Sequence, residues 1–143
     1  MSGTVQTIEH PADTGIEIWA DTLPELFTLA ARGLVSTGVE HPKKITAVIK
    51  KEISATGADL KELMVNFLSE FLYLIDTENF VMAKCQIDEL STTNNFSIRA
   101  TAWGEAFDLT KHGSVTDIKA ITYHQMIIEE VNQQWHARII FDI

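Results

Sequence analysis

The chain ends in a stretch of nine residues, WHARIIFDI at positions 135–143, in which apolar and polar side chains largely alternate. This period of two is typical of a β-strand with one buried face. Large side chains such as Trp135 and Phe141 on that face predict that packing holds the end of the strand in place. Asp142 and the terminal carboxylate of Ile143 then lie next to each other, which suggests a cation or a Lys supplied from elsewhere. The alternative is an ordinary strand whose polar residues face water.

The composition fits one domain spanning residues 1–143 and restricts the classes of partner. With a net charge of −9 and a pI of about 4.9, the chain does not suit strong nucleic-acid binding by itself, but it suits contact with a basic protein surface. No signal-peptide pattern and no apolar run of membrane-spanning length is present, so we expect a cytoplasmic protein without a membrane partner. The lone Cys85 excludes an intramolecular disulfide and is expected in the core.

Two helices are predicted from capping signals and apolar periodicity. Thr22 followed by Glu25 forms a capping box before an apolar stripe that ends near Gly38. Asp59 and Glu62 repeat the same signal. The stripe that follows, which predicts a helix packed on the sheet, consists of Leu60, Leu63, Met64, Phe67, Leu68, Phe71, Leu72 and Ile75.

Alternating patterns predict about seven short strands, at residues 5–9, 16–20, 45–55, 81–87, 96–102, 118–131 in two pieces, and 135–143. We interpret residues 103–113 as an irregular polar segment and residues 132–134 as a turn. Helices interspersed with antiparallel hairpins indicate an α+β fold, with two helices packed on a largely antiparallel sheet as a two-layer sandwich. The common catalytic templates, such as a phosphate-binding Gly-rich loop, are absent from the sequence.

The remaining polar residues of interest fall at strand ends and connections. They are His10, Asp13, Glu105, Asp108, His112, Lys119, His124 and Asp142. Carboxylates, a main-chain carbonyl and a chain terminus are oxygen ligands that suit a hard cation such as Ca²⁺ or Mg²⁺. The sequence does not show whether these residues converge.

Several motifs in register along the chain resemble the archease family. They are His10-x-Ala12-Asp13-x-Gly15, Leu26-Phe27 with Ala30-Ala31, Gly104-Glu105-x-x-Asp108-x-x-x-His112, Lys119-Ala120-x-Thr122-Tyr123-His124, and Trp135-x-Ala137-x-x-x-Phe141-Asp142-Ile143. The chain departs from the family pattern at Pro11, where Thr is usual.

The resemblance implies an activating cofactor and not an enzyme. Archeases assist the RtcB-type RNA ligase of tRNA splicing by promoting guanylylation of the ligase and its multiple turnover. The family's metal site maps to Asp13, Asp142 and the main chain or carboxylate of Ile143, with Ca²⁺ expected first and Mg²⁺ or Mn²⁺ as alternatives. Lys119 matches a position tied to activation, and further motif positions match His10, Glu105, His112 and His124. Two other functions stay open: a metal-dependent phosphoester hydrolase and a chaperone-like protein-binding module.

Overall fold

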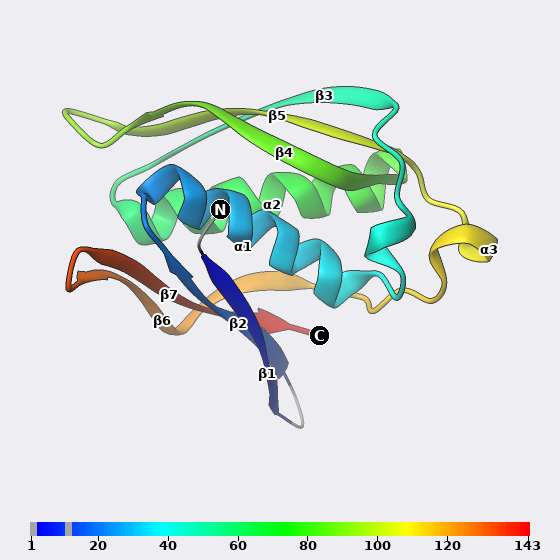
Figure 1. Cartoon of the computed structure of the whole chain (residues 1–143), viewed down its shortest axis with the longest axis horizontal. Helices are drawn as coiled ribbons and strands as arrows, with labels where there is room; N and C mark the ends of the chain where they lie inside the picture. The colour runs from blue at the N-terminus through cyan, green and yellow to red at the C-terminus, as the bar shows by residue number, and fades with distance from the viewer. Residues whose placement is uncertain (1–2, 11–12) are drawn as a thin grey trace.

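A computed structural model describes residues 3–10 and 13–143, with the side chains of residues 9 and 10 left out. Two long helices lie between two antiparallel sheets (Figure 1). In chain order the elements are β1 (Thr4–His10), β2 (Asp13–Ala20), α1 (Leu23–Gly38), the 3₁₀ helix η1 (Pro42–Lys44), β3 (Ile49–Gly57), α2 (Leu60–Glu78), β4 (Phe80–Ser91), β5 (Phe96–Ala106), α3 (Leu109–His112), β6 (Ala120–Val131) and β7 (Gln134–Asp142).

The α+β class and the antiparallel pairing are confirmed, but the arrangement of layers differs from the expectation. One sheet has the strand order β1-β2-β7-β6 and the other has β3-β5-β4. Each helix packs against both sheets: α1 contacts β2 and β4, and α2 contacts β3 and β6. The strands therefore form two sheets around a helical middle layer, where we expected one sheet and two layers. Strand periodicity shows which face of a strand is buried, but not which strands share a sheet.

Both predicted helix caps are present. The Glu25 backbone N–H donates to Thr22 Oγ1 at 3.2 Å, and the Glu62 N–H donates to Asp59 Oδ1 at 2.8 Å. Helix α2 ends at Asn79, whose left-handed φ of 55° closes the helix. These local signals fix where each helix begins. The apolar stripes are buried as predicted, but against two sheets and not one.

The core lies where the helices meet the sheets. Phe67 packs edge-to-face on Phe27 and on Phe71, with ring centroids 5.5 and 5.2 Å apart. From β7, Ile139 and Phe141 are fully buried against this layer. The terminal strand is thus held at its centre by packing, as its sequence predicts.

Several predicted boundaries need correction. Strand β2 begins at Asp13 and not at residue 16, and β4 continues to Ser91 and not only to residue 87. The strand expected over residues 45–55 begins only at Ile49, because Pro42 starts a 3₁₀ turn and the chain from residue 45 to 48 is a connection. The segment 103–113 is not irregular throughout: its first part continues β5, and its last part forms α3. The two pieces expected over 118–131 form one strand, β6, with a bulge between Thr122 and Ile127. No helix of the described ranges 3–10 and 13–143 is both long and apolar enough to cross a membrane.

Candidate functional site

The predicted carboxylates Asp13 and Asp142 are brought together by the pairing of β2 with β7. They are Cα partners at the end of this antiparallel ladder. Directly opposed residues point to the same face of a sheet, with Cβ atoms about 5 Å apart. Two like charges so placed repel each other unless a cation lies between them. No basic side chain forms an ion pair with either carboxylate among the residues that the structure describes.

Asp13 also lines an open cleft of about 420 Å³ beside the chain terminus. Its other walls are Ile143, Thr7, Thr14, Ser36, Thr37 and Thr116. Ser36 and Thr37 belong to the last turn of α1, which contains no basic residue. The negative end of the α1 dipole therefore adds to the negative potential of Asp13 and favours a cation in this cleft, although Asp142 does not line it.

The donor set fits a hard cation only if a further oxygen joins the two carboxylates. The Asp13 Oδ1 atom is buried and lacks a hydrogen-bond partner within the described part of the chain, so this oxygen is free to coordinate a cation. However, no group of three His, Cys, Asp or Glu side chains among the described residues could hold a metal. Asp13 and Asp142 supply two carboxylates, so a third oxygen would come from the main chain or the terminal carboxylate of Ile143.

Lys119 directly precedes β6, the strand that pairs with β7, and His124 lies within β6. The Lys119 backbone N–H donates to the Asp142 carbonyl at 2.7 Å, and Ala120 then pairs with Asp142. His124 is exposed within the β6 bulge, where its N–H donates to Thr122 Oγ1 at 3.3 Å. Lys119 is exposed as well, beside the end of the sheet that presents the carboxylates. His124 lies four residues past Ala120, the partner of Asp142, so the structure places only the Lys119 backbone next to the carboxylate pair.

His10 and Pro11 are described only in part. The backbone of His10 pairs with Asp13 at the end of the β1–β2 ladder. Its side chain lies outside the described residues, as does Pro11. The expectations for these two positions therefore stay predictions.

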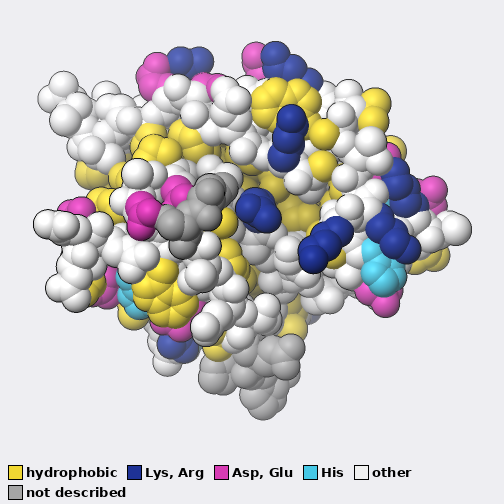
Figure 2. Space-filling view, in the orientation of Figure 1, with side chains coloured by type: hydrophobic (Ala, Val, Ile, Leu, Met, Phe, Trp, Pro, Cys, Tyr) yellow, Lys and Arg dark blue, Asp and Glu magenta, His cyan; other side chains and the backbone are white. Residues whose placement is uncertain are grey.

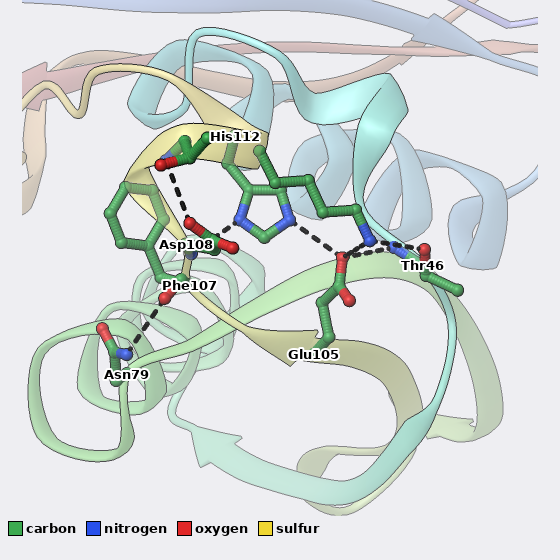
Figure 3. Close-up of polar contacts among 8 residues, drawn as sticks. Thr46, Asn79, Glu105, Phe107, Asp108 and His112 are labelled. Atoms are coloured by element: carbon green, nitrogen blue, oxygen red, sulfur yellow. Dashed lines mark hydrogen bonds and ion pairs between the residues drawn. The ribbon is translucent and has the colours of Figure 1, made fainter.

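Glu105 and His112 belong to a second polar cluster, at the end of β5 (Figure 3). His112 has no exposed surface. Its Nδ1 accepts the Asp108 backbone N–H at 3.0 Å, so the ring proton resides on Nε2, which donates to Glu105 Oε2 at 2.9 Å. Both ring nitrogens are thus satisfied in the neutral tautomer. The geometry is that of a buried structural histidine that fixes α3 against β5.

The Glu105 carboxylate is the electrostatic centre of this cluster. Its Oε2 accepts from the Lys111 ammonium at 2.7 Å and from the Thr46 backbone N–H at 2.8 Å. These two donors, followed by His112, hold the pKa of Glu105 at about 2, below its usual value of 4.5. The carboxylate stays ionised at neutral pH and joins β5, α3 and the residues before β3.

The two groups of predicted residues are separate but connected through the chain. Residues 113–119 run from His112 along the end of α1. The His41 N–H donates to the His112 carbonyl at 2.9 Å, and the Thr116 N–H donates to the Gly38 carbonyl at 2.9 Å. The segment then reaches Lys119 beside Asp142. The cluster around Glu105 thus fixes the start of residues 113–119, which lead to the end of the sheet where Asp13 and Asp142 lie.

A sequence model of the archease protein family matches residues 6–143. This match covers nearly the whole chain, including both groups of residues described above. The chain belongs to the archease family. Among curated members, protein archease of Pyrococcus furiosus is 37% identical over 136 residues, which is 94% of this chain and 95% of the relative. Protein archease of Methanosarcina mazei is 33% identical over 137 residues, covering 95% of this chain and 93% of the relative.

Two solved structures share the archease-family fold seen here. Protein 1598 of Methanobacterium thermoautotrophicum superposes with a TM-score of 0.79 at 23% identity, covering 97% of this chain and 98% of the other. An archease of Thermotoga maritima, described as a "possible chaperone", superposes with a TM-score of 0.61 at 19% identity, covering 95% and 94%. The similarity to these structures supports the two-sheet architecture.

Sequence reasoning about this archease-family chain missed several residues of both sites. Lys111 and Thr46 complete the Glu105 cluster, and Ser36 and Thr37 line the cleft beside Asp13. The spacing of Asp108 and His112, four residues apart, was an available signal for the short α3 turn. No local signal could have placed Thr46 beside Glu105, because the two are distant in the sequence.

Proposed function

We propose that this protein is an activating cofactor of an RtcB-type tRNA-splicing RNA ligase. It promotes guanylylation of the ligase and its multiple turnover, and it is not itself the catalyst. The observation that carries this proposal is the directly opposed pair Asp13 and Asp142 at one end of a rigid sheet, in a chain of the archease family. The partner is the ligase, and we place the pair of proteins in the cytoplasm.

The working surface in this proposal is the acidic tip, defined as Asp13, Asp142 and Ile143. These residues would hold a divalent cation, with Ca²⁺ first and Mg²⁺ or Mn²⁺ as alternatives. The cation neutralises two opposed carboxylates and joins the start of β2 to the end of β7. The net charge of −9 suits docking on the basic rim of an enzyme that binds RNA.

Lys119 and His124 would act beside the tip. Both are exposed, His124 in β6 and Lys119 directly before it, and the Lys119 backbone N–H is held at Asp142 by a hydrogen bond. An ammonium group next to a bound cation and carboxylates can contact the phosphates of a nucleotide in the ligase site. Glu105 and His112 would act indirectly, by holding residues 113–119, which lead to Lys119. His10, at the end of the β1–β2 ladder, is the last of the residues proposed to support activation.

The test is guanylylation of a cognate ligase with GTP and a divalent metal, at substoichiometric amounts of this protein. Wild type should stimulate the reaction through many ligase turnovers. Asp13→Asn and Asp142→Asn should each reduce the stimulation by about tenfold or more. Asp76→Asn, which removes one exposed charge on α2, is the matched control and should stimulate as wild type does. Absence of stimulation by folded wild-type protein would refute the cofactor role.

A chaperone-like binding role is the second candidate, because the Thermotoga maritima archease is described as a "possible chaperone". That role predicts protection of unrelated client proteins from heat aggregation, without dependence on Asp13 or Asp142. Light scattering of a generic client with wild type and with Asp142→Asn separates the two roles. Protection that is equal for both proteins, without ligase stimulation, would favour the chaperone role.

A further inference from the structure

Two cations without ionic partners line a groove on the exposed side of α1. Arg32 and Lys43 face a groove of about 170 Å³, whose remaining walls are Val35, Ser36, Pro42, Met82 and Ala83. Within the described ranges, neither cation has a side-chain ion pair or hydrogen bond, unlike Lys51, Arg99 and Lys111, which each pair with a Glu. Lys44, Lys61 and Lys119 are also unpaired there, but Arg32 and Lys43 line one groove together. In a chain with 20 acidic residues and 11 Lys and Arg, two neighbouring unpaired cations point to an anionic ligand.

The groove is built on rigid elements. Arg32 projects from the third turn of α1, next to Gly33, which is buried against Ile16. Lys43 lies in the 3₁₀ turn η1, closed by the Ile45 N–H donating to the Pro42 carbonyl at 3.2 Å. Pro42 fixes the backbone at the start of this turn. Binding at this groove would therefore require only side-chain adjustment.

The groove continues toward a basic aromatic surface on β4 and β5. Ala83 lines the groove, and the register of β4 shifts between Met82 and Lys84. Lys84 then lies over the Trp103 ring, with Nζ 4.8 Å from the centroid. Figure 2 shows Lys and Arg side chains gathered in the middle and on the right of the face that exposes α1. Lys84 covers one face of the Trp103 ring, so it adds positive charge beside the groove but leaves no open stacking surface on that face. A positively charged groove that follows the backbone is one feature by which proteins bind single strands.

The groove also adjoins the cleft of the acidic tip. Ser36 lines both hollows, with Asp13 and Ile143 on one side and Arg32 and Lys43 on the other. The same face thus presents a region suited to a cation beside a region suited to anions. A phosphate chain that contacts the cations would pass next to the tip.

We propose that Arg32 and Lys43, in the groove between α1, η1 and β4, bind the phosphate backbone of single-stranded RNA. The choice of RNA rests on the proposed function, in which the tip faces an enzyme that holds RNA ends. The guanidinium group of Arg32 offers bidentate contacts to phosphate oxygens, and Lys43 acts as a point charge. The net charge of −9 opposes this contact at long range, so the affinity is low and depends strongly on salt.

The test measures direct binding of a fluorescein-labelled oligouridine to the free protein by fluorescence anisotropy, at several salt concentrations. The double variant Arg32→Glu/Lys43→Glu should weaken binding by about tenfold or more and reduce the salt slope by about 1.4, because each of the two phosphates no longer neutralised accounts for ~0.7. Lys43→Glu alone is compared with Lys61→Glu, a matched charge reversal at an exposed position on α2. Circular dichroism checks that each variant is folded.

The outcomes separate this proposal from the ligase proposal, because no ligase is present. Loss of RNA binding in Lys43→Glu but not in Lys61→Glu supports the groove. Equal effects of the two reversals would mean that only net charge matters, and would overturn it. A competition experiment uses GTP. If GTP at matched phosphate concentration displaces the RNA, the groove binds nucleotide phosphates and the RNA assignment is wrong. Undetectable binding of wild type at low salt also overturns it, whatever the ligase assay gives.

Discussion

Asp13 and Asp142 face each other directly across β2 and β7, as the last pair of that ladder. Like charges in such a pair destabilise the sheet by about 0.2–1 kcal/mol. Asp142→Asn should therefore raise the melting temperature in the presence of chelator, by up to about 4 °C. Differential scanning calorimetry with EDTA measures this shift.

Ca²⁺ should reverse that order of stability. A ligand present at 100 times its Kd stabilises the native state by about 2.7 kcal/mol, so wild type should gain several degrees while Asp142→Asn gains little. Asp76→Asn should respond to Ca²⁺ as wild type does. If wild type and Asp142→Asn gain equally from Ca²⁺, the tip is not the binding site.

The pKa of Glu105 predicts how stability changes in acid. Because the pKa is about 2 when folded and 4.5 ordinarily, the stabilising effect of the carboxylate is fully present above about pH 4.5 and is lost as the pH falls toward 2. Glu105→Gln should be less stable than wild type at neutral pH, with the difference shrinking over that window. Urea unfolding at a series of pH values measures it. Glu70→Gln, exposed on α2, should show no such convergence.

Gly104 should not accept any side chain. A Cβ atom there would overlap the backbone carbonyl of Val81 in the paired strand β4 and also meet the Phe80 ring, and a backbone atom held in a strand ladder cannot move aside easily. We expect Gly104→Ala to cost on the order of 3 kcal/mol. Gly38→Ala is the control, because its Cβ would meet Ile118 Cδ1 and the Thr116 carbonyl oxygen at the ordinary distances of 3.6 and 3.9 Å. Equal stability of the two variants in urea unfolding would contradict the close approach of β4 and β5.

Phe67 should be the most sensitive position of the middle layer. Its side chain is fully buried and packs edge-to-face on Phe27 and Phe71, so Phe67→Ala removes two ring contacts and leaves a cavity. We expect a loss of about 3–5 kcal/mol. Tyr73→Ala, on the same helix but 55% exposed, should change stability by about 0.5 kcal/mol or less. Similar losses for both would mean that α2 is not sandwiched between the sheets.

Most local structure of this chain could be predicted from the sequence. The capping pairs Thr22–Glu25 and Asp59–Glu62 depend on contacts between residues three apart, so they form wherever the helix forms. The turn after β6 likewise follows from residues 132–134. Asn132 and Gln133 adopt left-handed φ values of 53° and 67°, which suit a two-residue hairpin between twisted strands.

The layers and both polar sites were decided only by tertiary structure. A helix can cover the apolar face of a strand in a two-layer or in a three-layer arrangement. Periodicity therefore could not show that α1 and α2 lie between two sheets. Asp13 meets Asp142, and Thr46 meets Glu105, only because strands distant in sequence pair in one register. The sequence determined which residues are chemically suited to a site. Their convergence is a long-range property, set by how the whole chain buries its apolar surface.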